Sequence, residues 1–227
     1  MIINPFIFLI NSGNPLWDGL QAYYTADNTP NDAIGSNNGT LTNGATYGTG
    51  IINQGFLLDG ANDYVDLPDN TFDYLSDFSI SGWFYSNSLS GDKSIYNVQN
   101  GSAEAVRIIT SGNKLLFKFI VGSSNNSLIS VSNLSISTWY HFVCTFEHGV
   151  GRKIYINGAL DASSVPLPPP DASAGTMYKA IGAYKLPATG HYFNGLIDEI
   201  AEFNGTLLNS TQVTELYNSG LGKQYPN

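Results

Sequence analysis

The chain has 227 residues, of which only 12% are charged, and its surface must therefore consist largely of Asn, Ser, Thr and Gly. The 18 acidic and 9 basic residues give a formal net charge of −9, and the basic residues form no cluster. Because phosphate binding depends on basic patches, this composition argues against a nucleic-acid partner, and no segment approaches the roughly 20 apolar residues that span a bilayer.

The chain begins with a mostly apolar segment of about ten residues. It has neither the basic start nor the small-residue cleavage site of a secretory signal peptide, so we predict no signal peptide. We interpret residues 1–15 as an apolar N-terminal arm and residues 16–227 as one domain. Exposed apolar segments are unfavourable in water, so we expect either the domain itself or a partner protein to cover the arm.

Short runs of β-branched and aromatic residues, separated by Gly, Asn, Asp and Ser, follow one another between residues 19 and 204. Apolar and polar residues alternate most clearly in residues 78–85, 114–121 and 139–146, as in strands with one buried face. The dipeptide Asn157-Gly158 predicts a tight hairpin turn, because both residue types tolerate positive φ. These patterns predict an all-β fold, with Cys144 as a small core residue.

One helix is predicted near the C-terminus. Asn209 and Gln212 have the spacing of a capping box, and apolar residues follow at helical intervals. Gly220 is the expected helix end.

The order of these segments resembles the concanavalin A-like lectin/glucanase superfamily, in particular its laminin G-like jelly-roll branch. The resemblance implies a two-sheet antiparallel jelly-roll sandwich with one short C-terminal helix. Two tryptophans, Trp83 and Trp139, are expected to face its core. The resemblance rests on residues 19–24, 39–47, 56–67, 78–84, 139–143, 153–158 and 193–200.

Glucanases of this superfamily carry carboxylates at alternate positions of one strand. On a regular strand Asp198, Ile200 and Glu202 share one face, so an isoleucine replaces the middle carboxylate. The two remaining carboxylates would lie about 13 Å apart, whereas a retaining glycosidase needs about 5–5.5 Å. We therefore predict that the protein is not an enzyme.

The resemblance also implies a structural calcium ion beside Asp198. Asp27, or the turn formed by Asp59 and Gly60, would supply further oxygen ligands, of which calcium prefers six to eight. The alternative is that Asp198 only accepts hydrogen bonds from backbone amides.

Carbohydrate recognition requires exposed aromatic rings beside groups that form hydrogen bonds. Residues 184–192 combine both kinds of group in one loop bounded by Gly and Pro. Zinc is not expected, because no two of the three histidines have metal-ligand spacing. The candidate ligand-binding residues are Tyr96, Arg107, Tyr184, Lys185, His191 and Tyr192.

The sequence thus predicts a non-catalytic carbohydrate-binding or adhesion module whose partners are glycans or cell-surface polysaccharides. The polar, weakly charged surface and the N-terminal arm favour a virion or extracellular location, such as a phage capsid decoration or tail component docked through the arm. Two alternatives stay open. The first is a structural scaffold or decoration protein that binds only proteins, and the second, which is less favoured, is a polysaccharide hydrolase or lyase.

Overall fold

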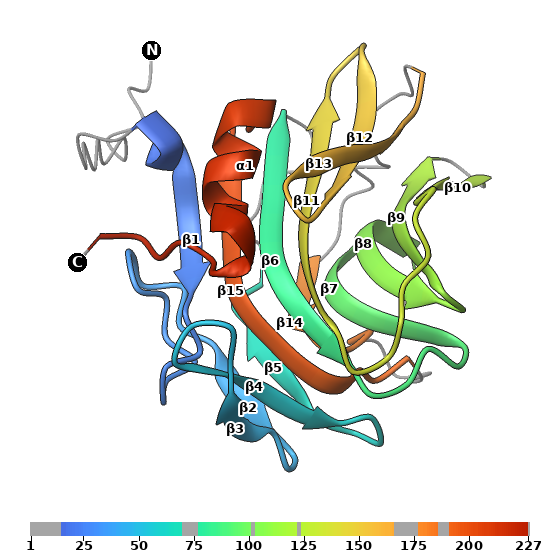
Figure 1. Cartoon of the computed structure of the whole chain (residues 1–227). Coiled ribbons are helices and arrows are strands. Elements are labelled where there is room, and N and C mark those ends of the chain that lie inside the picture. The colour runs from blue at the N-terminus through green and yellow to red at the C-terminus, as the bar shows by residue number, and fades with distance from the viewer. Residues whose placement is uncertain are drawn as a thin grey trace, which may run out of the picture.

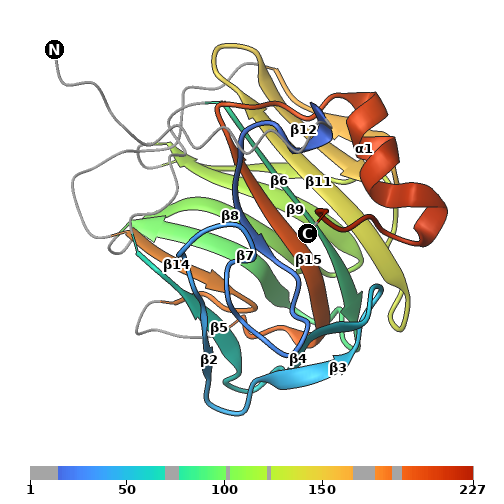
Figure 2. The ribbon, with the colours of Figure 1, turned by 90° about the vertical axis from the view of Figure 1, so that its left-hand side faces the viewer.

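The computed structural model describes residues 15–69, 77–100, 103–121, 124–165, 177–185 and 191–226. The predicted N-terminal arm, apart from Pro15, lies outside these residues. Two antiparallel sheets face each other, and one helix, α1 (Ser210–Tyr217), packs on the outer side of one of them (Figures 1 and 2). The predicted jelly-roll sandwich with a short C-terminal helix is confirmed.

We call the sheet beneath α1 the helix-side sheet and the other one the far sheet. The helix-side sheet has the order β13 (Ala159–Ser163), β12 (Gly151–Ile156), β11 (Trp139–Glu147), β6 (Phe78–Ser86), β15 (Asn194–Asn204), β4 (Gln54–Asp59) and β3 (Thr46–Thr49), and β1 (Leu20–Tyr24) also pairs with β15. The far sheet has the order β10 (Ser124–Ile129), β9 (Lys114–Val121), β8 (Ala103–Ser111), β7 (Asp92–Asn100), β14 (Met177–Ile181), β5 (Tyr64–Leu67) and β2 (Thr40–Thr42).

The main core lies between the two sheets, where alternate residues of the strands meet. Phe84 and Phe142 come from the helix-side sheet and Phe117 from the far sheet, and all three are buried. Cys144 is buried in the same core, as predicted. Burial of each such large side chain stabilises the fold by about 1.5–3 kcal/mol. A second cluster beneath α1 joins Val213 to Leu16, Trp17 and other residues.

The predicted turns are present. Asn157 and Gly158 have φ of 50° and 81° between β12 and β13, as a tight hairpin turn requires. The side chain of Asn209 accepts hydrogen bonds from two backbone amides of α1, and the backbone amide of Asn209 donates to the Gln212 side chain, which completes the predicted capping box. The helix ends earlier than predicted, because Asn218 already takes the left-handed conformation, two residues before Gly220.

Strand β15 contains a bulge that the sequence analysis did not predict. Its N-terminal half pairs with β4 and its C-terminal half with β1, and between them Glu199 has a φ of 53°. The bulge changes the alternation of faces, so that Asp198 points outward while Ile200 and Glu202 point into the core. The prediction that Asp198 and Glu202 share a face is therefore wrong.

The prediction that Trp83 and Trp139 face the core is also wrong. Because Phe84 and Phe142 take the core positions, the neighbouring odd-numbered positions of β6 and β11 face outward. Trp83 is 3% exposed and stacks on Tyr217 of α1, with ring centroids 5.7 Å apart. Trp139 is only half-buried and lies on the outer surface.

Candidate functional site

The outer face of the far sheet carries most of the predicted ligand-binding residues. Asp66, Ala180, Asn97, Arg107 and Lys118 lie directly opposite one another on five successive strands, from β5 to β9. Directly opposite residues share a face, and this row alternates with core residues on every strand. Arg107 therefore points away from the core, beneath Tyr184 in the segment that follows β14.

Tyr96 does not belong to this surface. It lies in β7 rather than in a loop, and it is fully buried in the core between the sheets. Burial raises its pKa well above the ordinary value, and the nearby Glu202 raises it further. The prediction of Tyr96 as an exposed ligand-binding residue is therefore wrong.

The other five predicted residues lie in the same region, and we call them the loop cluster: Arg107, Tyr184, Lys185, His191 and Tyr192. The guanidinium carbon of Arg107 lies 4.8 Å from the centre of the Tyr184 ring. The rings of Tyr184 and His191 meet edge to face at 6.0 Å, and Nδ1 of His191 lies 3.2 Å from the carbonyl oxygen of Asp92. The segment that follows β14 and the segment that precedes β15 thus lie in contact.

Lys185 and Tyr192 pack against outward side chains of β5 and the turn after it. The ammonium of Lys185 lies 2.5 Å from Asp66 and 2.8 Å from Asp69. Burial lowers the pKa of Lys185, but the two carboxylates outweigh this effect and raise it. The ring of Tyr192 lies 6.5 Å from that of Tyr64.

The loop cluster offers partly exposed rings next to charged groups that are already paired. Tyr184, Lys185, His191 and Tyr192 are all partly exposed, whereas Arg107 is only 2% exposed. Arg107 thus supports the Tyr184 ring from below by a cation–π contact. Aromatic faces beside carboxylate and ammonium groups can hold the apolar face and the hydroxyl groups of a sugar.

Residues of β5 and β14 that were not predicted from the sequence complete this surface. Tyr64 and Asp66 alternate with buried Val65, so the sequence pattern already indicated their shared face. Their position beside the loop cluster depends on the pairing of β5 with β14, which no local pattern encodes. Tyr178 of β14 lies under Lys185, with the ammonium 5.5 Å from its ring centre.

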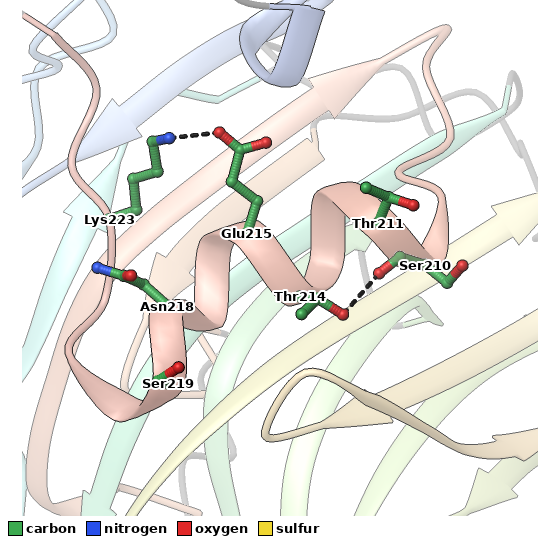
Figure 3. A pocket seen from close by; sticks show the side chains of 7 residues that line it. All are labelled: Ser210, Thr211, Thr214, Glu215, Asn218, Ser219 and Lys223. Carbon is green, nitrogen blue, oxygen red and sulfur yellow. Dashed lines mark hydrogen bonds and ion pairs between the residues drawn. The ribbon is translucent and has the colours of Figure 1, made fainter.

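A shallow groove of about 710 Å³ lies along α1, on the other side of the sandwich (Figure 3). Its side chains are short or already bonded: Lys223 contacts Glu215, and the hydroxyl of Thr214 donates to the Ser210 carbonyl at 2.9 Å. No aromatic ring lines it, so it is a weaker candidate for a sugar site. The lining residues are Ser210, Thr211, Thr214, Glu215, Asn218, Ser219 and Lys223.

The side chains of the expected calcium ligands Asp198 and Asp27 already accept hydrogen bonds from the protein. Both carboxylate oxygens of Asp198 accept backbone amides, from Ile51 and Ile52 at 2.9 and 3.2 Å and from Glu199 at 2.8 Å. Asp27 lies near Asp198 and raises its pKa slightly, but the oxygens of Asp27 likewise accept hydrogen bonds, from Gln54 among others. Calcium prefers six to eight oxygen ligands.

The turn of Asp59 and Gly60 lies elsewhere. Asp59 pairs with Asn194, four residues before Asp198 along β15, and its side chain accepts the amides of Ala61 and Asn62. Four residues of strand correspond to about 13 Å. Within the described ranges, no three His, Cys, Asp or Glu side chains are grouped so that they could hold a metal ion. Calcium binding is untested and stays a prediction from the sequence.

Burial strongly affects the two acidic residues at the bulge. It raises the pKa of Asp198 to about 8, although three backbone amides oppose the shift. It also raises the pKa of Glu199 to about 8, against a hydrogen bond from Gln224. The hydroxyl of Tyr23 donates to the same Glu199 carboxyl group. These groups fix the junction of β1, β4 and β15, and nothing about them resembles a paired catalytic site.

Comparison with known proteins is consistent with this architecture. The profile of a family described as the concanavalin A-like lectin/glucanases superfamily matches residues 59–214. A search of curated protein sequences finds no match. No helix among the described residues is long and apolar enough to cross a membrane.

Several solved structures share the fold. Domain 4 of AbnA, an extracellular arabinanase from Geobacillus stearothermophilus solved with arabinotriose, has a TM-score of 0.71 and 22% identity, with 90% of this chain and 98% of that chain covered. Botulinum neurotoxin type C, solved in a study of its interaction with two ganglioside molecules, has a TM-score of 0.70 and 21% identity, with 92% of this chain and 52% of that chain covered. The binding domain of Paraclostridial Mosquitocidal Protein 1 has a TM-score of 0.69 and 20% identity, with 90% of this chain and 53% of that chain covered. The chain spans about half the length of these two toxin chains.

Proposed function

Because the chain belongs to the concanavalin A-like lectin/glucanase superfamily, we propose that it is a non-catalytic carbohydrate-binding module whose ligand lies on the loop cluster. The observation that carries the proposal is that the Tyr184 ring lies over the buried Arg107 and meets the ring of His191, while Tyr64 and Tyr192 form a second aromatic pair. Half-exposed rings next to fixed polar groups suit a sugar, which has both an apolar face and hydroxyl groups. The arabinanase domain solved with arabinotriose supports this ligand class through its fold.

The positions of the carboxylates support a function without catalysis. Asp198 and Glu202 point to opposite sides of the helix-side sheet, so they cannot flank one scissile bond. Glu202 is fully buried in an ion pair with Lys179, at 2.9 Å. We expect no release of reducing ends from a panel of glucans, arabinans and alginates.

Binding is tested on a glycan array and then by calorimetry, with arabinotriose as the first probe. We expect Tyr184→Ala and Tyr192→Ala to weaken binding at least tenfold, because each removes a ring on which a sugar can stack. Tyr192→Phe keeps the ring and should stay within about threefold of the unmodified protein, as should Ser210→Ala in the groove along α1.

Two results would contradict the proposal. One is the absence of binding to any glycan on the array or to intact polysaccharides. The other is glycan binding that is weakened by Ser210→Ala and unchanged by both tyrosine variants, because the ligand would then occupy the groove along α1.

The proposed biological setting is adhesion as part of a phage virion. Adhesion through cell-surface polysaccharide as part of a phage virion rests on composition, and the proposed docking segment lies outside the described residues. Deletion of residues 1–14 should abolish assembly while the domain still unfolds cooperatively. A truncated protein that still assembles would exclude the arm as the anchor.

A further inference from the structure

A row of apolar side chains crosses the outer face of the helix-side sheet. Trp139 of β11, Tyr85 of β6, Leu196 of β15 and Leu57 of β4 lie directly opposite one another on adjacent strands. All four point outward, because their neighbours along the strands fill the core. We call these four residues the outer row.

The outer row lies beyond the part of the sheet that α1 covers. Trp83, two residues before Tyr85 on β6, stacks under Tyr217 of the helix, whereas α1 does not extend over the other end of β6 and β15 (Figure 1). Leu57 is 37% exposed, and the other three members are half-buried. The rings of Tyr85 and Trp139 are tilted by 53°, with their centroids 5.6 Å apart.

A polar border runs along the side of the outer row that faces away from α1. Asn194 precedes Leu196 by two residues and therefore shares its face, and it pairs with Asp59 of β4. The exposed amide of Asn87 donates to the side-chain oxygen of Asn194 at 3.1 Å. Within this patch, Gly48 leaves the surface flat, because a Cβ there would lie 3.0 Å from the Leu196 side chain.

We infer that the outer row is a second carbohydrate site, which binds a neutral oligosaccharide chain lying across the strands. The row is about 14 Å long, from three strand spacings of about 4.8 Å, and one side chain wide. Such a narrow apolar strip matches the faces of consecutive sugar rings, while the amides and the carboxylate beside it match their hydroxyl groups.

Shape and charge determine this choice of ligand. A stable protein interface needs about 800 Å² on each partner with an apolar centre, which one row of four side chains does not provide. Asp59 is the charged member of the border, so an acidic sugar would meet a carboxylate rather than a cation. The site lies on the opposite sheet from the loop cluster, so its occupation does not depend on the proposed function of that cluster.

Tryptophan fluorescence reports directly on this site. The chain contains three tryptophans, of which Trp17 and Trp83 are 2% and 3% exposed, so iodide quenching reports chiefly on Trp139. The probes are arabinotriose, xylotetraose, cellotetraose and laminaritetraose. We expect at least one of them to shift the emission to shorter wavelength and to halve the quenching constant.

Variants separate the two sites. Trp139→Ala and Leu196→Ala should weaken the binding of that oligosaccharide at least tenfold by calorimetry, whereas Trp139→Phe should stay within about threefold because it keeps a flat ring. Tyr192→Ala in the loop cluster should leave the fluorescence response intact. Thermal unfolding of each variant shows whether it is folded.

The inference is overturned if no probe protects tryptophan and if Trp139→Ala and Leu196→Ala bind glycans as the unmodified protein does. Binding that is sensitive only to Tyr192→Ala would have the same consequence but would leave the proposed function standing. Self-association in sedimentation that Trp139→Ala abolishes would also overturn it, because a second copy would then cover the row.

Discussion

Lys179 and Glu202 form an ion pair between the two sheets, although their cross-strand partners are apolar: Leu67 and Val98 beside Lys179, and Ala22 and Ile80 beside Glu202. Their charged atoms are 2.9 Å apart, and the side chains are 1% and 0% exposed. The charge of Glu202 also raises the pKa of the nearby Tyr24 and Tyr96, after burial as the main cause. Taking two charges out of water is so unfavourable that each is tolerated only because the other is present.

We therefore expect strong coupling between the two residues. Glu202→Gln or Lys179→Met alone should lower the free energy of unfolding by about 3–5 kcal/mol, because each leaves one buried charge without its partner. The double variant Lys179→Met/Glu202→Gln should lose much less than the sum of the two single losses. Urea unfolding of all four proteins measures the coupling, and additive losses would contradict this view of the pair.

At the level of elements, the approach of β15 to β6 depends on Gly195. Its φ is 141°, and a Cβ there would lie 2.0 Å from the carbonyl oxygen of Tyr85. Gly195→Ala should therefore destabilise the fold by well over 1 kcal/mol, because it combines a disfavoured φ with a steric clash. Gly91→Ala is the matched control: its φ is also positive, but nothing lies within 4 Å, so about 1 kcal/mol is expected. Equal losses in thermal unfolding would show that the close approach is unimportant.

The strands and the helix could be predicted because their signals are local. Alternation indicated β6, β9 and β11, and the spacing of Asn209 and Gln212 indicated the start of α1. The bulge at Glu199 has no such signal, since it arises where β15 changes partner from β4 to β1. The outward position of Trp83 and Trp139 was missed because size alone was taken to indicate the core, whereas the parity set by Phe84 and Phe142 decides it.

At the scale of the whole molecule, only part of the candidate site could be predicted from the sequence. Tyr184, Lys185, His191 and Tyr192 are close in sequence, so their shared loop was visible. The contact of Arg107 with Tyr184 depends on the order of strands in the far sheet. With the outer row on the opposite sheet, the sandwich presents two proposed sugar surfaces, one on each side, and a polysaccharide-coated cell could then engage both.

The dependence of stability on pH follows from three buried groups. Asp198 and Glu199 have pKa values raised from 3.8 and 4.5 to about 8, so the folded chain keeps protons there that the unfolded chain has released. This difference lowers stability as the pH rises towards 8. Burial lowers the pKa of His141 from 6.5 to about 3, so below pH 6.5 the unfolded chain binds a proton that the folded chain does not. That contribution raises stability as the pH rises to 6.5.

Between pH 6.5 and 8 only the carboxyl contribution of these three operates, and we expect the free energy of unfolding to fall by about 3 kcal/mol, since one pKa unit corresponds to about 1.4 kcal/mol per group. Glu199→Gln should flatten this decline, because the amide has no proton to release, whereas Glu215→Gln on α1 should keep it. Urea unfolding at four pH values measures the slope. A stability that does not fall from pH 6.5 to 8 would mean that both carboxyl groups are ionised in the folded protein, with the backbone amides around Asp198 outweighing its burial.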